Sequence, residues 1–569
     1  MCAVEVPLAS RPTTGSIPVI SLFCGCGGMD LGFSRAGFVT LLALDKNKVA
    51  IQSYNVNDAR HAARECDLAK LTGRQLAQLL REASPAELPR GVIGGPPCQA
   101  FSNGNTNKKR HDPRARLGQA FGHLLDTLNR EIGLDFFVFE NVVGLTTRPH
   151  RHRFASIQRT LRLAGFNVFV EKLDAGDFGV PQRRHRLLIV GINSARFPWV
   201  QFKHPEPTAP APTVREAIGG LPEPVLYRRG INRDNIPVHV NHWTMYPKSR
   251  KFLTGIQGTG RSFKRLAWGK PSYTVAYGNR EIHIHPAGNR RLSVFEAMLL
   301  QGFPYSYELS GSLSDQITQV SDALPPPLAE AVAAAIRKSL YTPIESFQSS
   351  LLAWWEKNQR QFPWRKTADP YKILIAEKLL QQTAATDNVV RAYRQIVTKY
   401  PNWYALAKAR VGELRGIVEP LGFKYRASEL VSLARSLCKH HASELPRDLR
   451  QLLKLPGVGD YCARALMSFA FGQRFGVIDT NVARFLVRYF GLPLRISKNP
   501  ARDRRLHAVA DALMPAAKSK EINLAILDIC SAHCKAREPQ CSGCPMQGSC
   551  AFYRTATAGK AVPSEGSAA

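Results

Sequence analysis

The sequence predicts two folded regions in series, an α/β region with a mostly parallel sheet followed by an all-α region. The chain has 569 residues, which is too long for a single hydrophobic core. Between Ile17 and Ile192, short β-branched runs alternate with amphipathic stretches, as in a sheet covered by helices. After a predicted break at Tyr341–Pro343, helical periodicity dominates and strand alternation is lacking.

Within the first region the pattern predicts five strands and then a change of character. Residues 196–272 are rich in Pro, Arg, His and aromatic residues without clear periodicity, so we expect a separate, irregular module there. Order returns at Arg291–Pro304 and in a predicted helix at Pro327–Ser339. The expected strands are Val19–Phe23, Val39–Leu44, Gly91–Ile93, Phe136–Glu140 and Leu187–Gly191.

The charge balance indicates a polyanionic partner. There are 77 Lys and Arg residues against 44 Asp and Glu, a net charge of +33, and nucleic acid is the commonest partner of such a chain. No run of about 18 apolar residues is present, so we expect no membrane span. The start of the chain lacks the features of a secretory signal. In the reducing cytoplasm that this implies, the 12 cysteines are better interpreted as thiols, nucleophiles or metal ligands than as disulfides.

A glycine-rich loop, Ser21–Gly28, lies between a predicted strand and a predicted helix. Its glycines allow a ligand to approach the backbone closely, and Asp45 ends the next strand, where a carboxylate suits ribose hydroxyls. A simple tight turn is the alternative for this loop taken alone.

A cysteine follows the next strand on a Pro-Pro turn, in Gly94–Ser102. A lone cysteine is usually a small buried residue. Cys98, however, is predicted at the carboxyl edge of a parallel sheet, where ligands collect.

Together these segments resemble the cytosine-5 DNA methyltransferases, whose motifs occur here in family order. The matching segments are the glycine-rich loop, the GGPPCQAFS loop around Cys98, Glu140-Asn141-Val142, Gln182–Arg186, Arg291–Pro304 and Gln319–Pro325.

The resemblance implies addition of the Cys98 thiolate to C6 of cytosine. Glu140 would hydrogen-bond or protonate the ring at N3, and Arg184 and Arg186 would hold the base and the catalytic carboxylate. The target cytosine would leave the duplex by base flipping.

The resemblance also implies S-adenosylmethionine as cofactor, with Asp45 on the ribose and Asp67 near the adenine. Two departures concern cofactor affinity and local packing: Ser321-Asp322 replaces the usual Gly-Asn, and Phe295 stands where Arg is usual. The expected cofactor-binding residues are Phe23, Gly25, Gly27, Gly28, Asp45, Asp67, Pro97 and Asp322.

Near the end of the chain, four cysteines are spaced C-x6-C-x2-C-x5-C. Four thiolates bind either a zinc ion or an iron–sulfur cluster. The segment Leu455–Gly459 reads as the hairpin of a helix-hairpin-helix, in which Gly457 and Gly459 expose N–H groups to a DNA phosphate. Asp479 follows twenty residues after Gly459; a helix cap is its ordinary role. The four cysteines are Cys534, Cys541, Cys544 and Cys550.

This half resembles the endonuclease III-like DNA glycosylases. The resemblance implies a [4Fe–4S] cluster on the four cysteines and Asp479 as the catalytic aspartate, stabilising the cationic sugar. Tyr461 replaces the lysine of lyase members, so β-lyase activity should be absent or weak. Thymine mismatch members have Tyr at this position.

Other features bear on which base is removed. The segment Glu377–Thr383 resembles the segment of MutY-type adenine glycosylases in which the Glu acts as an acid on the purine. In thymine removal Glu377 would instead position water. The alternative is that Glu377 is an exposed helix residue without a catalytic role. Gln381 and Gln382 would insert where the flipped base leaves. The chain ends soon after the cysteines, without the further domain of MutY enzymes, which favours thymine.

We therefore expect a bifunctional DNA enzyme that methylates cytosine and removes thymine, or uracil, from the T·G mismatches that deamination of 5-methylcytosine produces. An adenine glycosylase, or one half acting as an inactive DNA-binding module, are the alternatives. We expect double-stranded DNA as partner, a bacterial restriction–modification setting with a companion endonuclease, a nucleoid-associated location in the cytoplasm, and a monomer. The predicted domains are a catalytic core at 17–195, a target recognition domain at 196–285, core completion at 286–342, the glycosylase at 343–529, the cluster loop at 530–555 and a disordered tail at 556–569.

Overall fold

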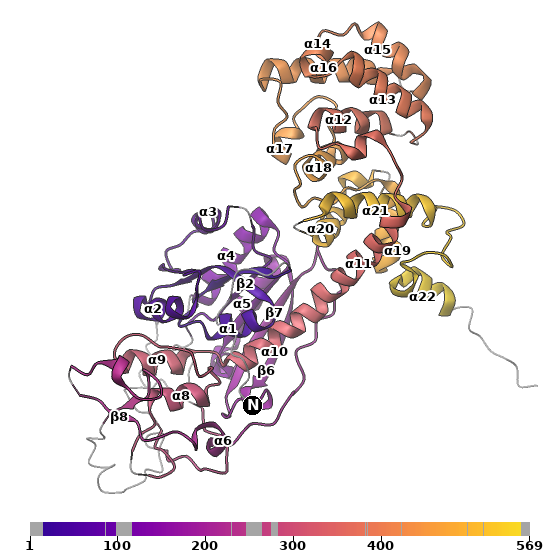
Figure 1. Ribbon diagram of the computed structural model, residues 1–569. Coiled ribbons are helices and arrows are strands. Elements are labelled where there is room, and N and C mark those ends of the chain that lie inside the picture. Colours follow the sequence, from indigo (N-terminus) through magenta and orange to yellow (C-terminus); the bar gives the residue numbers. More distant parts are fainter. Residues whose placement is uncertain are drawn as a thin grey trace, which may run out of the picture. The chain divides into compact units, whose positions relative to one another are not determined.

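The computed structural model describes residues 15–85, 87–97, 117–228, 230–245, 264–274, 283–288, 290–381, 383, 385–422, 424–497, 499–515 and 517–558. Contacts divide the chain into two units (Figure 1): Met1–Ser194 with Val200–Tyr341, and Ala195–Trp199 with Thr342–Ala569. Among the described residues, no helix combines the length and the apolar character needed to cross a membrane.

The first unit is built on a seven-stranded sheet in the order β3-β2-β1-β4-β5-β7-β6. The five strands from β3 to β5 are parallel to their neighbours, whereas β7 is antiparallel to both β5 and β6. Every residue of β1 and β4 is buried, as expected for strands covered on both faces. The strands are β1 (Ile17–Leu22), β2 (Phe38–Asp45), β3 (Ala63–Glu65), β4 (Gly91–Gly94), β5 (Phe136–Asn141), β6 (Phe166–Asp174) and β7 (His185–Asn193).

The mixed α/β fold is confirmed. All five expected strands overlap observed ones; the sequence pattern missed the edge strands β3 and β6. β3 has three residues, and the outer part of β6 is only partly buried, so neither shows a clear apolar run.

Helices cover both faces of this sheet, and α1 packs along α10 (Figure 1). A Cβ at Gly32 of α1 would lie 2.4 Å from the carbonyl oxygen of Pro326, so these helices meet backbone to backbone. The helices are α1 (Gly28–Arg35), α2 (Lys48–Asn57), α3 (Gly73–Ala83), α4 (Leu117–Ile132), α5 (Arg151–Leu163), α8 (Val294–Leu300), α9 (Leu313–Asp322) and α10 (Pro326–Ile336).

The expected irregular module has little regular structure in its described residues. It contains α6 (Val214–Ile218) and the two-residue strands β8 (Val225–Leu226) and β9 (Trp243–Thr244). Its apolar residues share one core with those of α8 and α9. The module is therefore anchored on the helices that complete the first unit.

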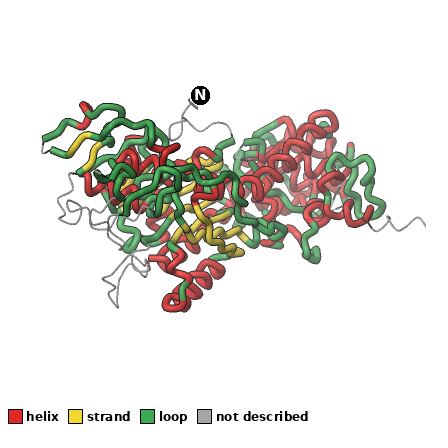
Figure 2. Tube along the Cα trace, turned by 90° about the horizontal axis from the view of Figure 1, so that it is seen from below, coloured by secondary structure: helices red, strands yellow, loops and turns green. Residues whose placement is uncertain are grey.

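The second unit is all-helical within its described residues, and Figure 2 shows the strands, in yellow, in the first unit. The segment from α12 to α18 encloses one large apolar core. The helices are α11 (Thr342–Asn358), α12 (Pro370–Leu380), α13 (Asp387–Lys399), α14 (Trp403–Ala407), α15 (Val411–Val418), α16 (Tyr425–His440), α17 (Leu449–Leu452), α18 (Asp460–Phe469), α19 (Thr480–Phe490), α20 (Arg504–Leu513), α21 (Ser519–Ala532) and α22 (Ala551–Ala558).

Two local expectations were wrong. The predicted break at Tyr341–Pro343 is helical, because a π-type turn at Arg337–Tyr341 leads directly into α11. The wider bonding of a π turn accommodates a proline that lacks an N–H donor. Residues 556–558 of the predicted tail belong to α22, and the rest of that tail lies outside the described residues.

Candidate active sites

The glycine-rich loop after β1 is held by the carboxylate that ends β2. Asp45 accepts hydrogen bonds from the backbone N–H groups of Gly25 (2.9 Å) and Asn47 (2.8 Å). Gly25 has φ +55°, and no described atom lies within 4 Å of a Cβ built on it. Phe23 also has a positive φ, of 58°. Glycine adopts this conformation without strain, whereas Phe23 is strained, and the backbone at Gly25 borders open space that a ligand could fill.

The other two predicted cofactor glycines of the loop lie close to other protein atoms. A Cβ at Gly27 would lie 2.9 Å from the hydroxyl of Tyr307, and one at Gly28 would lie 2.6 Å from the carbonyl oxygen of Leu324. Only Gly25 among the three predicted cofactor glycines therefore has open space at its α-carbon.

Glu140, at the end of β5, lies against the start of the Cys98 loop. Arg186 Nε is 2.8 Å from Glu140 Oε1. A Cβ at Gly95 would lie 2.7 Å from Glu140 Oε2, and Asn141 Nδ2 donates to the Pro96 carbonyl at 3.2 Å. Burial raises the pKa of Glu140, although Arg186 and Arg184 oppose this shift. Cys98 lies outside the described residues, which stop at Pro97 on this side of the loop.

Arg184 is fully buried, and it holds the predicted Gln319–Pro325 segment. Its Nη2 donates to the carbonyl oxygens of Ser321 (2.6 Å) and Ala323 (3.0 Å). The residue between them, Asp322, is exposed, yet desolvation by the surrounding protein raises its pKa, as does the nearby charge of Asp45. Arg184 thus fixes the backbone on both sides of Asp322.

Asp67 is exposed, and its described contacts are local: it accepts from Ala69 N at 3.1 Å and pairs with Lys70 at 3.7 Å. Its predicted role near the adenine stays a prediction.

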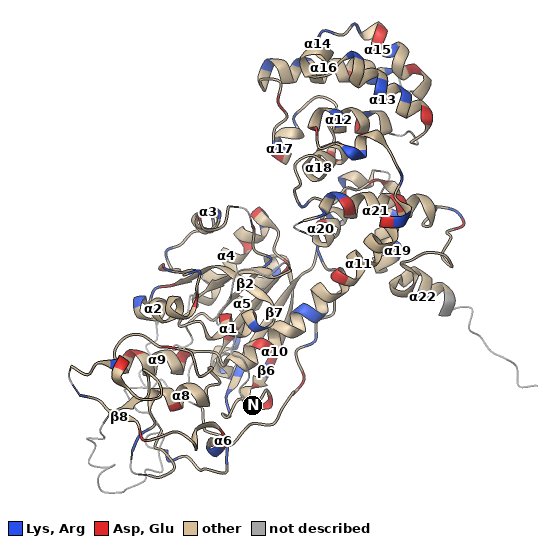
Figure 3. Cartoon of the chain, viewed as in Figure 1, with Lys and Arg blue, Asp and Glu red and all other residues tan. Residues whose placement is uncertain are grey.

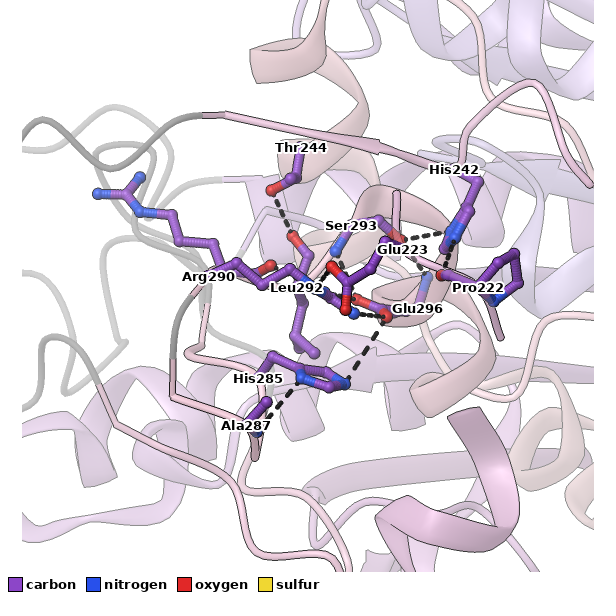
Figure 4. A network of polar contacts seen from close by, with 11 residues as sticks. Pro222, Glu223, His242, Thr244, His285, Ala287, Arg290, Leu292, Ser293 and Glu296 are labelled. Atoms are coloured by element: carbon purple, nitrogen blue, oxygen red, sulfur yellow. Dashed lines mark hydrogen bonds and ion pairs between the residues drawn. The ribbon is translucent and has the colours of Figure 1, made fainter. Parts of the chain in front are cut away.

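A buried charge network fastens the irregular module to α8 (Figure 4). Glu296 is fully buried and accepts from both Nη atoms of Arg290, at 2.9 and 2.8 Å. Ser293 and Glu296 form a capping box at the start of α8, and His242 of the module lies 3.0 Å from the Ser293 hydroxyl. These hydrogen bonds favour one arrangement of such a loop-rich module.

Phe295 is part of the core of the first unit. Its ring is fully buried, stacks on His239 at 4.1 Å and meets Tyr305 edge-on at 4.7 Å. The departure therefore has a packing role within the first unit.

The second unit holds a cavity of about 520 Å³ that brings together three of the predicted residues. Glu377 comes from α12, Tyr461 from α18 and Asp479 from the start of α19. Three further residues line the cavity and were not predicted from the sequence: Arg365, Asn481 and Lys520. Asn481 could have been predicted, because it lies two residues after Asp479.

Glu377 is a buried acid at the floor of this cavity. Glu377 is 5% exposed, and desolvation raises the pKa of its carboxyl group to about 7. A hydrogen bond with Tyr461 and the charge of Arg365 act in the opposite direction. Its Oε2 has no hydrogen-bond partner among the described residues. The exposed-helix alternative for Glu377 is therefore wrong, because this acid is buried with one oxygen unsatisfied.

Asp479 caps α19 and also faces the cavity. Its Oδ1 accepts from the Val482 N–H at 2.7 Å, and its Oδ2 accepts from Asn481 Nδ2 at 3.2 Å. The cap fixes the carboxylate at the helix N-terminus on the cavity wall, so the helix-cap interpretation is confirmed, and the catalytic role stays a prediction.

We expect a Glu377→Gln variant to become progressively more stable than the parent as pH rises. A folded-state pKa of about 7 against an ordinary 4.5 means that the unfolded chain ionises first, so the parent loses stability between those pH values. The gap in unfolding free energy between variant and parent should grow by about 2 kcal/mol from pH 5 to pH 8. Denaturant unfolding at both pH values measures it, with Glu356→Gln at an exposed site of α11 as control. An unchanged gap would contradict an ionisation cost at Glu377.

The hairpin at Leu455–Gly459 precedes α18. Gly457 has φ +70°, which favours glycine, and no described atom lies within 4 Å of a Cβ on Gly459, the N-cap of α18. Gln381 is half-buried: its Oε1 accepts from Lys378 Nζ at 3.1 Å and its Nε2 donates to Cys462 Sγ at 3.2 Å. Gln382 lies outside the described residues.

The four predicted ligand cysteines, Cys534, Cys541, Cys544 and Cys550, line one small cavity of about 30 Å³. Desolvation raises the pKa of Cys544 to about 11, and the charges of the other three thiols act in the same direction. Among the described residues, no group of three or more His, Cys, Asp or Glu side chains is close enough to hold a metal ion.

Two arginines of α19 tie this cysteine loop to the helix that Asp479 caps. Arg484 donates to the Cys534 carbonyl from Nη2 at 2.6 Å, and Arg488 donates to the Lys535 carbonyl from Nη1 at 2.7 Å. The cysteine loop and the cavity wall are thus parts of one structure.

Comparisons with known proteins assign both halves. Residues 17–338 match the family model of the C-5 cytosine-specific DNA methylases, and residues 375–511 match that of the HhH-GPD superfamily of base excision DNA repair proteins. The chain belongs to both families. It is thus a methyltransferase domain followed by a glycosylase domain.

Each half of the chain aligns with almost the full length of its curated relatives. The methyltransferase domain is 31% identical over 350 residues to Type II methyltransferase M.MthTI of Methanothermobacter thermautotrophicus, a match of 57% of this chain and 98% of the relative. The glycosylase domain is 36% identical over 214 residues to a thymine-DNA glycosylase of Aeropyrum pernix (37% of this chain, 95% of the relative). It is also 34% identical over 209 residues to a thymine/uracil-DNA glycosylase of M. thermautotrophicus (36% and 93%).

Proposed function

We propose that this chain methylates cytosine at C5 within a specific DNA sequence and removes thymine, or uracil, that lies opposite guanine. The observation that carries the second activity is the cavity where Glu377, Tyr461 and Asp479 meet, in a domain whose relatives are named for thymine and uracil. Figure 3 shows lysines and arginines along the helices of both units, in keeping with a DNA partner.

In the methyltransferase domain, Cys98 would add to C6 of the flipped cytosine through its thiolate. Glu140 is suited to hydrogen-bond or protonate the cytosine ring at N3, because its raised pKa favours a retained proton and Arg186 fixes its orientation. The open space at Gly25 and the carboxylates of Asp45 and Asp322 fit a bound nucleoside, so these residues would hold S-adenosylmethionine. When bound, this cofactor supplies the methyl group.

In the glycosylase domain, Asp479 would stabilise the positive charge that develops on the sugar as the base departs, and orient the attacking water. Glu377 would hold that water or a polar edge of the base through its unsatisfied Oε2. Tyr461, in place of a lysine, offers no amine for a Schiff base, so excision should leave an intact abasic strand.

We further propose that the four cysteines hold a [4Fe–4S] cluster. Such a cluster distributes its thiolates over four iron atoms, so it needs four sulfurs around one cavity rather than around one point. The four thiols line one cavity, and desolvation, together with the charges of neighbouring thiols, raises the pKa of Cys541 and Cys544, which fits a group that neutralises several thiolates. The cluster would order the loop that Arg484 and Arg488 tie to α19.

Cys544→Ser should lose the cluster. We expect about four iron atoms per chain in the parent and fewer than one in the variant, with loss of the cluster's visible absorption. Because the loop is bound to α19, thermal unfolding of the glycosylase domain should shift to lower temperature. Cys438→Ser, at a half-buried cysteine of α16 outside the loop, is the matched control. One zinc atom per parent chain, without iron, would contradict the cluster and favour a four-cysteine zinc site.

The pairing of activities has a chemical reason. Deamination of 5-methylcytosine gives thymine opposite guanine, so a tethered thymine glycosylase would remove the damage that methylation creates. Relatives of both halves occur as separate proteins in M. thermautotrophicus. A restriction–modification setting in a bacterial cytoplasm, with a companion endonuclease and a monomeric enzyme, completes this proposal.

The test of base specificity is strand cleavage after alkali on labelled duplexes that contain T·G, U·G, A·G or A opposite oxidised guanine. Thymine and uracil duplexes should be cleaved, and without alkali the strand should stay intact. Preferential cleavage at adenine would contradict the proposal and make Glu377 the acid of an adenine glycosylase.

A further inference from the structure

A lysine that the mechanism does not use is buried beside the glycosylase cavity. Lys378 follows Glu377 on α12, and its side chain is only 2% exposed. An ammonium group carries three hydrogen-bond donors, and all three have acceptors here: Glu429 Oε2 at 2.5 Å, the Gly457 carbonyl at 2.9 Å and Gln381 Oε1 at 3.1 Å. A buried lysine with a full set of partners costs too much desolvation to be incidental packing.

The three acceptors belong to three different segments. Glu429 lies on α16, Gly457 is the left-handed residue of the hairpin, and Gln381 is at the end of α12. A Cβ at Gly457 would lie 3.3 Å from both Lys378 Nζ and Glu429 Oε2, so the hairpin rests directly on the ion pair.

The end of α12 is fixed from other directions as well. Arg426 of α16 donates from Nη1 to the Leu379 carbonyl at 3.1 Å and from Nη2 to Thr383 Oγ1 at 2.9 Å. Gln381 Nε2 donates to Cys462, the neighbour of Tyr461 on α18. Among these contacts, the Lys378 ammonium links the end of α12 to the hairpin backbone.

We propose that Lys378 is a positioning residue that sets the hairpin and the Gln381 segment in the relative placement at which both contact DNA. This inference rests on the proposed excision function and on the DNA contacts expected from the sequence, of the hairpin N–H groups with a phosphate and of Gln381 with the duplex. Lys378 acts through Gly457 and Gln381 and touches neither base nor sugar. Its removal therefore weakens DNA binding and leaves the chemistry at Asp479 largely unchanged.

The test compares Lys378→Met with the double variant Lys378→Met/Glu429→Leu. Affinity for a T·G duplex is measured by fluorescence anisotropy in the Asp479→Asn background, and the excision rate at saturating enzyme is measured with Asp479 present. Lys378→Met should raise the Kd about 10- to 100-fold, the loss expected for hydrogen bonds to a charged donor. The saturating rate should change less than about threefold, because that rate is set at the cavity. Lys372→Met, at a partly exposed lysine near the other end of α12, is the matched control.

The double variant distinguishes a positioning role of Lys378 from a simple loss of stability caused by an unpaired buried carboxylate. Removing both charges should restore the thermal stability that Lys378→Met loses, since no unpaired carboxylate remains, but the Kd should stay raised. A double variant that binds DNA like the parent would overturn the proposal, and so would a Lys378→Met variant that loses saturating rate but keeps its affinity. Binding is read without excision, so a parent that excises no base would contradict the proposed function and not this inference.

Discussion

Asp479→Asn should lower the rate of thymine excision by about 10²- to 10³-fold, the size of effect found when one electrostatic stabiliser of a transition state is removed. The negative charge of Asp479 stabilises the positive charge that forms on the sugar, and an asparagine carries no such charge. Asparagine caps helices about as well as aspartate, so the Val482 N–H should keep its partner and α19 should keep its place.

The measurement is single-turnover release of thymine from a T·G duplex at saturating enzyme. Asp503→Asn is the matched control, because Asp503 caps α20 in the same unit and lies outside the cavity. Methyl transfer should be unchanged in both variants. Retention of most of the excision rate in Asp479→Asn would mean that the carboxylate is only a helix cap.

Cys98→Ala should abolish methyl transfer, with a loss of about 10⁴-fold or more, as is typical when a covalent nucleophile is removed. Without addition of a thiolate at C6, cytosine C5 is too weak a nucleophile to take a methyl group. The matched control is Cys66→Ala, which removes a half-buried thiol from the same unit. Transfer of radiolabelled methyl groups from S-adenosylmethionine to DNA measures the effect.

Excision of thymine should be unaffected by Cys98→Ala. Methyl transfer by this variant at a rate within tenfold of the parent would show that Cys98 is not the nucleophile. Loss of both activities from either single variant would contradict two separate active sites.

The sequence predicted most of the architecture because its strongest signals are local. Buried strands such as β5 contain continuous apolar runs, here Phe136–Phe139, and the residues after these runs mark the predicted functional edge of the sheet. Asp479 and Tyr461 were predicted from the resemblance to the endonuclease III-like glycosylases, and the structure brings both to one cavity with Glu377. Family membership supplied the chemistry at these positions.

What the sequence did not predict depends on contacts between distant segments. Nothing near Lys378 in the sequence indicates that its ammonium reaches Glu429 and Gly457, 51 and 79 residues away. Similarly, Gly27 and Gly28 looked equivalent to Gly25, and only their neighbours Tyr307 and Leu324 distinguish them. The continuous helix through Pro343 depends on a π turn that no residue pattern announced.

The central claim is that one chain both makes 5-methylcytosine and removes the thymine that follows from its deamination. The most direct test is one incubation of the full chain with S-adenosylmethionine and a mixed set of duplexes, some carrying a single T·G pair. Mass spectrometry then quantifies 5-methylcytosine in the DNA and free thymine in solution. We expect both products, with Cys98→Ala abolishing only the first and Asp479→Asn strongly reducing only the second. Absence of either product from the parent incubation, or release of adenine in place of thymine from duplexes that offer both, would contradict the claim.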